Sequence, residues 1–364
     1  IQRQEHTFCR RESFWEMFND FCKRRNRMAR QFDRKLVLEN GDVYAGYAFG
    51  ADIERVCELV YNTAVVGYQE IISDPSYTYQ AVVMTYPLIG NYGVTEEDNE
   101  TNNPQIGALI VREYNDSPSN FRYTKTLGET LEEDKVPGLE GIDTRKLTRF
   151  IRDNGSIKGM ICNFDRPTEE ALEIIKNTEI RKNAVSVVSC KKRWYSRTFN
   201  PKYNVIAIDC GIKHSIIRSL NARGCNLTIV PWNTTIEEIE NMNPDGILIS
   251  NGPGDPHEVK EVIELVKTLR GRHPIFGIGL GHLLINLAYG AEVYKMKNGP
   301  RGGNHPVKVL ENGRVLITGQ NHSYAVCEES LEGTGLSVTC KDVVDGSVEG
   351  TEAKADRVFS LQYH

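Results

Sequence analysis

The sequence lacks the features that mark a membrane or secreted protein. No uninterrupted apolar run approaches the roughly 18 residues that a membrane-spanning helix needs. No short apolar segment follows basic residues in the manner of a secretory signal peptide. We therefore expect a cytoplasmic protein that makes no membrane contact.

An excess of basic charge is missing as well. The 44 Lys and Arg residues face 49 Asp and Glu residues, so the net charge is −5 and the pI is near 6.0. A protein that neutralises many phosphates needs a broad basic surface. Nucleic acid is therefore a disfavoured partner, and small molecules and other proteins remain.

Cysteine occurs without a pattern. The nine cysteines are odd in number, scattered, and contain no Cys-x-x-Cys, which argues against a disulfide framework and against zinc. We expect no metal site and mostly buried thiols. The composition, with 40% hydrophobic and 26% charged residues, is typical of a globular protein. A chain of 364 residues is longer than a single-core domain usually is, so two domains are predicted.

Residues 1–34 differ from the rest and are predicted to be an extension. Residues 1–30 hold eight Lys and Arg against four Asp and Glu. Aromatic residues at helical spacing between 14 and 21 would allow an amphipathic anchor for a membrane or a partner. The sequence opens on Ile1, and Met28 stands just before the first strand-like run. We therefore favour translated upstream codons over an anchor.

A β-rich first domain is predicted over residues 35–190. Strand-like runs flank the Asn-Gly turn at 39–42, and a helix over 144–154 has Asp143 as its N-cap and Gly155 after its end. The polar stretch 96–103 is expected to be an exposed loop. The predicted strands are 35–38, 43–49, 57–66, 81–86 and 108–111. These features favour an α+β or mostly β domain that ends near 190–203.

An α/β second domain is predicted over residues 203–364. Apolar strands at 205–208, 227–230, 246–250 and 274–278 alternate with helices at 212–223, 235–242 and 258–270. Alternation of this kind builds a parallel sheet with helices on both faces. Hairpin-like strands follow at 292–297, 307–310, 314–318, 336–339 and 358–361.

Two loops at the expected carboxyl edge of this sheet stand out, because ligands bind there in open α/β sheets. Residues 250–256 read Ser-Asn-Gly-Pro-Gly-Asp-Pro, in which Gly252 and Gly254 would let backbone N–H groups face an oxyanion. A plain turn explains the same residues. Residues 277–282 read Gly-Ile-Gly-Leu-Gly-His between a strand and a helix, as in an elbow that presents a nucleophile.

These motifs carry a family resemblance. The second half resembles a class I, triad-type glutamine amidotransferase domain, and the chain from about Lys35 resembles the small, glutamine-hydrolysing subunit of carbamoyl-phosphate synthetase. The resemblance implies a flavodoxin-like second domain. The first-domain motifs are residues 61–63, 67–71, 74–77, 85–91 and 141–149, and the second-domain motifs are 250–256, 277–282, 301–307 and 320–322.

The resemblance implies a reaction and its partners. In the family, a Cys at the elbow attacks the glutamine carboxamide, a His transfers the proton, and a Glu two residues beyond orients that His. The ammonia passes to a large subunit, which makes carbamoyl phosphate from bicarbonate and ATP. The implied partners are glutamine and the large subunit. ATP and Mg²⁺ would belong to the large subunit, so no cofactor is expected in this chain.

Ten positions match the site of the family. The nucleophile position is Gly279, and the proton-transferring His is His364. The oxyanion donors would be the N–H groups of Gly252 and Leu280. The remaining positions, expected to contact glutamine, are Ser76, Gly254, Leu283, Asn321, Ser323 and Tyr324. Each could instead be a turn or a satisfied loop residue, and the density of the match favours the site.

The sequence departs from the family at the centre of this site. Gly279 replaces the Cys, Leu283 replaces a Gln that holds substrate in bacterial members, and 298–300 read Asn-Gly-Pro in place of an aromatic-Gly-His. The sequence ends at His364, so the Glu does not occur in it, which we interpret as a boundary of the sequence alone. His282 is expected to be structural, and Cys210 to be a packed thiol and not a substitute nucleophile.

Two hypotheses therefore remain. In the first, the chain is a small subunit of carbamoyl-phosphate synthetase whose glutaminase activity is lost or severely reduced, because a thioester needs a thiolate. In the second, it is a non-catalytic regulatory or scaffold subunit of an ammonia-using enzyme. Both arginine and pyrimidine synthesis remain open as the pathway served.

Overall fold

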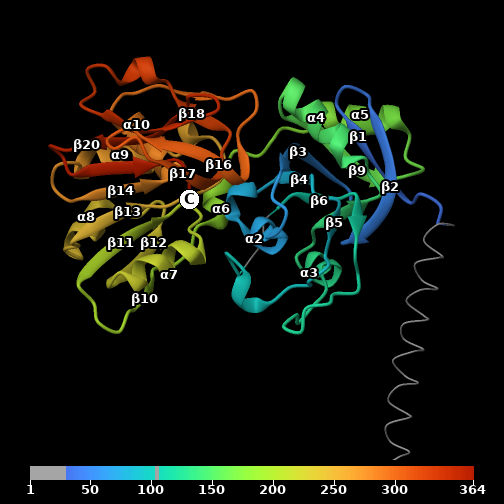
Figure 1. Cartoon of the computed structure of the whole chain (residues 1–364), viewed down its shortest axis with the longest axis horizontal. Coiled ribbons are helices and arrows are strands. Elements are labelled where there is room, and N and C mark those ends of the chain that lie inside the picture. The colour runs from blue at the N-terminus through green and yellow to red at the C-terminus, as the bar shows by residue number, and fades with distance from the viewer. Residues whose placement is uncertain (1–29, 103–105) are drawn as a thin grey trace, which may run out of the picture.

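The computed structural model describes residues 30–102 and 106–364, which form two lobes side by side (Figure 1). The described chain ends at the junction of the two lobes. The amphipathic segment expected between residues 14 and 21 lies outside the described residues. Within the described ranges, no helix is both long and apolar enough to cross a membrane.

The first lobe is built on a closed seven-stranded β-barrel in the order β1-β2-β8-β6-β4-β3-β9. The expected hairpin forms, because Gly41 takes φ +92° in the turn and lets the two strands pair antiparallel. The barrel strands are β1 (Arg34–Leu38), β2 (Val43–Gly50), β3 (Arg55–Asn62), β4 (Gln80–Met84), β6 (Ala108–Ile110), β8 (Pro137–Glu140) and β9 (Ile157–Asn163). Closure leaves this sheet without an exposed edge.

Short helices cover the barrel. The predicted helix is confirmed as α4 (Thr144–Asn154), with the Asp143 side chain accepting from Lys146 N at 2.9 Å and Gly155 at φ +97°. Four helices of this region escaped the sequence patterns: α2 (Tyr68–Ser73), α3 (Leu127–Glu133), α5 (Thr168–Asn177) and α6 (Ala184–Val188). A two-stranded parallel sheet joins β5 (Leu88–Ile89) to β7 (Glu113–Tyr114).

The second lobe contains one twelve-stranded mixed sheet whose centre is parallel, as expected. Its parallel strands lie in the order β12-β11-β13-β14-β21, and the flanking strands are antiparallel. The strands are β10 (Trp194–Ser196), β11 (Tyr203–Asp209), β12 (Cys225–Pro231), β13 (Gly246–Ile249), β14 (Ile275–Ile278), β15 (Val293–Lys295), β16 (Arg301–Val309), β17 (Val315–Asn321), β18 (Tyr324–Val326), β19 (Ser337–Asp342), β20 (Val348–Ala353) and β21 (Val358–Leu361).

The position of β21 corrects one expectation. The segment 358–361 was expected to be hairpin-like, and it does pair antiparallel with β20. It also pairs parallel with β14, with Gly277 opposite Ser360. The end of β21 therefore lies beside the end of β14, which brings the residues that follow the two strands together.

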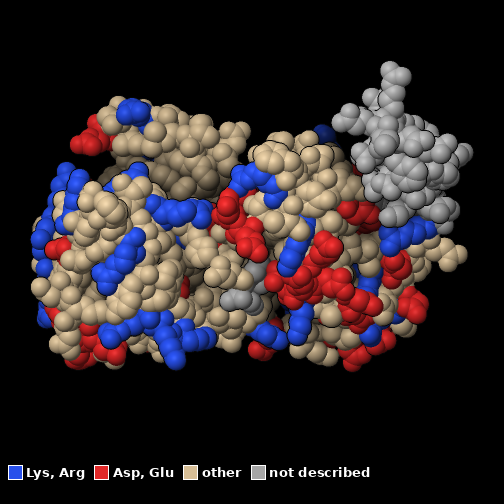
Figure 2. All heavy atoms as spheres, turned by 90° about the horizontal axis from the view of Figure 1, so that it is seen from below, with Lys and Arg blue, Asp and Glu red and all other residues tan. Residues whose placement is uncertain are grey.

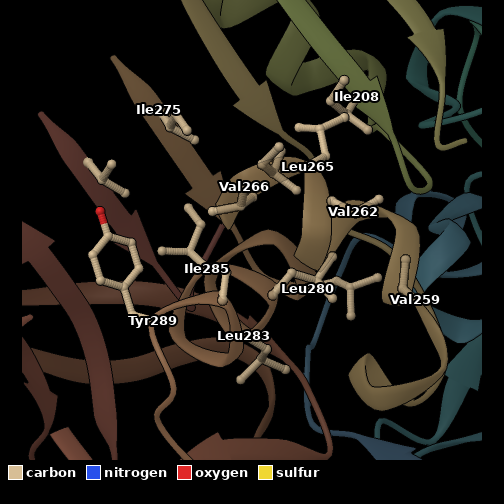
Figure 3. Packing of buried hydrophobic residues seen from close by; sticks show 14 of the residues in the cluster. Ile208, Val259, Val262, Leu265, Val266, Ile275, Leu280, Leu283, Ile285 and Tyr289 are labelled. Atoms are coloured by element: carbon tan, nitrogen blue, oxygen red, sulfur yellow. The ribbon is translucent and has the colours of Figure 1, made fainter. Parts of the chain in front are cut away.

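Helices cover this sheet as the sequence predicted. They are α7 (His214–Ala222), α8 (Ile236–Asn241), α9 (Lys260–Leu269) and α10 (Leu280–Ala288). Figure 3 shows the apolar cluster between α9, α10 and the sheet, in which Leu280, Val262 and Ile285 are almost completely buried. This dense packing holds the first turn of α10 in place behind the elbow.

The polar stretch 96–103 is not wholly an exposed loop. Its first acidic residues are exposed, but Glu100 is buried and reaches the second lobe. The Glu100 carboxylate accepts from Ser215 N at 3.0 Å, and its carbonyl accepts from His214 N at 2.9 Å. These bonds satisfy the first N–H groups of α7, whose N-cap residue, Lys213, provides no side-chain cap.

Candidate active site

The elbow between β14 and α10 is formed by Gly279. This residue has φ +57° and ψ −112°, a conformation that disfavours any side chain. Its N–H donates to Leu361 O at 2.9 Å, and Gly281 N donates to Ser250 O at 3.1 Å. A Cβ at position 279 would lie 2.5 Å from Nε2 of His364. The elbow therefore faces the histidine, whose imidazole leaves no room for a side chain at position 279 in this arrangement.

Backbone donors face the same space. Gly252 follows β13, and a Cβ there would collide with the carbonyl of Cys210. Leu280 is the first residue of α10. Neither the Gly252 nor the Leu280 N–H donates a hydrogen bond within the described ranges. Free N–H groups at a glycine loop and a helix start can stabilise an oxyanion.

His364 follows β21 and closes the cavity. Its N–H donates to Gly319 O at 3.1 Å. The residue as a whole is exposed, but Nε2 of its ring is turned toward Gly279. Burial of the ring, aided by the Lys213 ammonium, lowers the pKa of His364 to about 4. The imidazole is therefore neutral at pH 7 and able to accept a proton.

A polar cluster joins the lobes beside this histidine. Asp74 is buried, and its carboxylate accepts from Lys213 Nζ at 3.3 Å and from Asn321 Nδ2 at 3.5 Å. Burial opposes the ionisation of Asp74, but the Lys213 charge outweighs it and lowers the pKa of this carboxyl. Burial likewise opposes the charge of Lys213, while Asp74 and Glu100 raise the pKa of its ammonium. The cluster is thus an ion pair at neutral pH.

Ser76 enters the site from the first lobe. The 3₁₀ turn Pro75–Tyr77 begins at Asp74, whose carboxylate accepts from Ser76 N at 2.9 Å. The Ser76 hydroxyl accepts from Asn251 Nδ2 at 3.2 Å. Asn251 is fully buried, and its Oδ1 accepts from Lys213 N at 3.3 Å. One amide therefore ties the serine to the start of α7.

The cavity that these residues surround has a volume of about 250 Å³. Leu283, on the first turn of α10, adds an apolar wall to the cavity, as expected from its replacement of a polar residue in the family pattern. Gly279 lies directly behind the cavity, against His364. The other nine predicted positions line it: Ser76, Gly252, Gly254, Leu280, Leu283, Asn321, Ser323, Tyr324 and His364.

The third departure lies at the contact between the lobes. Asn298 donates from Nδ2 to the Tyr61 hydroxyl at 2.7 Å. Gly299 packs so closely on His322 that a Cβ would overlap the carbonyl of that residue. Next along the chain, Arg301 is buried and donates to the Ser323 hydroxyl at 2.5 Å. Segment 298–300 therefore supports the wall of the cavity from outside.

His282 and Cys210 do not face the cavity. His282 is fully buried, its Nδ1 is 2.8 Å from the Ser360 hydroxyl, and burial lowers its pKa to about 3. Cys210 is fully buried too, and burial raises the pKa of its thiol far above the ordinary value. Across the described residues, no cluster of His, Cys, Asp and Glu could hold a metal ion.

Sequence reasoning missed three residues of the site: Asp74, Lys213 and Asn251. Asp74 and Asn251 stand inside motifs that the sequence displays, at the head of 74–77 and in 250–256. Because they stand next to the predicted site residues Ser76 and Gly252, the sequence could have indicated them as further site residues. Lys213 follows β11 and belongs to no recognisable sequence motif. Its role becomes visible only from its contact with Asp74 of the first lobe.

Comparison with known proteins identifies the family. The family model described as carbamoyl-phosphate synthase small chain, CPSase domain, matches residues 36–161. The model described as glutamine amidotransferase class-I matches residues 206–364. A carbamoyl phosphate synthase small chain from Fusobacterium nucleatum is 48% identical over 333 residues, which cover 92% of this chain and 92% of that protein. The chain belongs to the carbamoyl-phosphate synthase small chain family.

Other members of the small chain family are about equally similar. The small chain of Bacillus cereus strain ZK is 49% identical over 91% of this chain and 90% of its own length. That of Staphylococcus epidermidis is 46% identical over the same shares. Membership therefore rests on both lobes.

Proposed function

We propose that this chain is the amidotransferase chain of a carbamoyl phosphate synthase, that it binds a large chain, and that it does not hydrolyse glutamine by the covalent route of its family. The observation that carries the proposal is Gly279 at the elbow, with His364 Nε2 in the space of a side chain. The expected domains, 35–190 and 203–364, belong to the same proposal.

The covalent route needs a thiolate at the elbow. In that route the sulfur bonds to the carboxamide carbon, the C–N bond breaks, and ammonia leaves with a proton from the histidine. Gly279 offers no sulfur. Cys210 cannot replace it, because its thiol is buried and protonated and attack tolerates little displacement. In this proposal, glutaminase activity is lost because position 279 has no sulfur atom, while the rest of the cavity keeps its shape.

Binding of glutamine persists in weakened form. The hydroxyl of Ser76, the amide of Asn321 and the free N–H groups of Gly252 and Leu280 remain in the cavity. Leu283 supplies no hydrogen bond, which costs about 1–3 kcal/mol of binding where a polar substrate group is left unpaired. We propose that these residues and His364 form the glutamine subsite. No cofactor takes part in this chain, and ATP and Mg²⁺ act in the large chain.

A second candidate is a non-catalytic scaffold that supports a large chain fed by free ammonia. The apolar Leu283 in the wall of the cavity favours it, because a chain that never binds glutamine has no use for a polar residue there. The two candidates differ in glutamine binding. Calorimetric titration with glutamine distinguishes them: weak binding supports the first, and none supports the second.

Co-expression with the large chain tests the proposal. Carbamoyl phosphate is measured from glutamine and, separately, from ammonium. We expect formation from ammonium alone. Formation from glutamine at a rate typical of the family contradicts the proposal. Failure of the two chains to co-purify contradicts the assignment of the partner.

Restoration of the nucleophile is the matched variant. Gly279→Cys with Leu283→Gln, in a chain completed beyond His364, should recover glutamine-dependent synthesis if the pocket is otherwise intact. The new Cβ requires His364 to turn away, and only the end of a side chain has to move. Leu283→Gln alone is the control, and it should improve glutamine binding without restoring turnover.

A further inference from the structure

A basic segment precedes and includes the first strands of the second lobe, although the whole chain is acidic. Residues 180–208 contain seven Lys and Arg residues and no Asp or Glu. Figure 2, drawn from the side on which β10 lies in Figure 1, shows Lys and Arg spread over the second lobe and Asp and Glu gathered on the first. Arg181 and Lys182 of this segment line the cavity between the lobes, but its other five cations, from Lys191 to Lys202, do not.

The centre of the segment is an edge strand. β10 stands at one end of the twelve-stranded sheet and pairs only with β12 among the described residues, with Tyr195 opposite Thr228. The other side of β10 makes no backbone hydrogen bond in the described ranges. Such an edge offers N–H and C=O groups to an added strand.

The strand is held firmly on its inner side. The Ser196 hydroxyl accepts from Asn221 of α7 at 2.6 Å, and Thr198 N donates to Asn226 Oδ1 at 3.0 Å. Side chains alternate along a strand, so Tyr195 lies on the face opposite Ser196, and the Arg197 guanidinium packs over the Tyr195 ring on that side. Arg193 directly precedes the strand. A rigid edge with a defined outer face is therefore already formed before any partner binds.

The outer face combines aromatic rings with cations. Phe199 is 96% exposed and Tyr195 is 49% exposed, with the Arg197 guanidinium 5.0 Å from the Tyr195 ring centroid. Lys192, Arg193 and Arg197 are exposed and form no ion pair within the described residues. Cations alone would protect an edge strand from unwanted pairing. Exposed aromatic rings work against protection and are enriched where proteins bind each other.

A cleft continues from this edge. Trp194 and Lys191 line a space of about 340 Å³ between the lobes, together with Ile212 and His214. Trp194 is 37% exposed and lies on the same face of the strand as Ser196. An apolar side chain of an added strand would reach this cleft, while its alternate side chains would face Arg193 and Arg197.

We propose that β10 and the flanking residues 191–199 bind an extended acidic segment of another protein, which adds a strand to the sheet. The charge pattern selects the partner: Asp or Glu at alternate positions faces Arg193 and Arg197, and apolar residues between them face Trp194. A single-stranded nucleic acid would use the rings and cations but not the free edge of the backbone. This proposal does not depend on glutamine hydrolysis.

A model peptide tests the proposal with the full chain. The probe is a fluorescein-labelled decapeptide that alternates Glu and Val, and binding is followed by fluorescence anisotropy. Charge reversal at Lys192→Glu, Arg193→Glu and Arg197→Glu should weaken binding at least tenfold. The matched control reverses three exposed cations elsewhere in the lobe, Lys260→Glu, Lys308→Glu and Arg314→Glu, and should change binding less than twofold.

A second peptide separates strand addition from charge attraction. Replacing each Val by Pro keeps the charge and removes half of the backbone donors, so binding should fall at least tenfold. Three results would overturn the proposal. They are equal binding of the two peptides, an equal loss of affinity in both charge-reversed proteins, and no binding at millimolar peptide. Tighter binding of an oligo-dT of equal length than of the acidic peptide would contradict the proposal and assign residues 191–199 to nucleic acid binding. Self-association that the first charge reversal abolishes assigns these residues to a second copy. Thermal unfolding confirms that each variant is folded.

Discussion

At the scale of the residue, Gly279 shows how one position decides both conformation and chemistry. Its φ of +57° is costly for any residue with a Cβ, and His364 lies against it. Glycine avoids this strain, so we expect any side chain at position 279 to destabilise the fold.

Gly279→Ala should therefore lower the free energy of unfolding by about 1–3 kcal/mol, through backbone strain and the close approach of His364 Nε2. Urea unfolding followed by circular dichroism measures the change. Gly303→Ala is the matched control, because a Cβ there meets no atom within 4 Å and its φ is not positive. Equal stability of the two variants would show that the elbow is not strained.

At the scale of the element, the start of α7 depends on a residue from the other lobe. Lys213 at the N-cap position provides no side-chain cap, and Glu100 accepts the N–H groups of His214 and Ser215 instead. A helix N-terminus favours a carboxylate, both as acceptor and through the helix dipole. The first lobe thus completes an element of the second.

Glu100→Gln should destabilise the protein by about 0.5–2 kcal/mol, the range for loss of a charged cap. Differential scanning calorimetry measures the shift in Tm. Glu96→Gln, on the exposed part of the same loop, is the control and should leave Tm unchanged. The idea fails if Glu96→Gln lowers Tm as much as Glu100→Gln does.

At the scale of the whole molecule, burial and neighbouring charges set the protonation of groups in and around the cavity between the lobes. His282 and His364 stay neutral because burial lowers their pKa values to about 3 and about 4. Asp74 stays charged because Lys213 outweighs its burial. Each group contributes to how the stability of the molecule depends on pH.

Stability should fall as the pH drops from about 6.5 toward 4. In this range the unfolded chain binds protons on histidines that the folded chain keeps neutral, so each contributes a slope of up to about 1.4 kcal/mol per pH unit. The lowered pKa of Asp74 adds stability above its unfolded pKa, which is lost as the pH falls through the folded value. Urea unfolding at a series of pH values measures the slope.

The variant His282→Asn isolates one histidine. It should flatten the dependence between pH 6.5 and 4 while running parallel to the parent above pH 7, even though it is less stable throughout. An unchanged acid slope would show that His282 does not resist protonation in the folded state.

Local sequence patterns determined much of this protein. The Asn-Gly turn at 39–42, the Asp143 cap of α4, the βα alternation and the glycine-rich elbow at 277–282 all predicted elements that form. Each depends on neighbours in the sequence, because caps, turns and hydrophobic periods act within a few residues. The glycine-rich loops also predicted where nine of the ten candidate site positions would meet around one cavity.

Only the tertiary structure decided how distant segments meet. It closed the barrel and paired β21 with β14 in a defined register. It also joined residues more than a hundred positions apart, because Asp74 contacts Lys213 and Glu100 contacts the start of α7. No local pattern encodes such pairing, since it is set by the burial of whole faces and the satisfaction of buried charges. The short helices α2, α3 and α6 were missed for a related reason: one or two turns carry too little periodicity and are stabilised by packing.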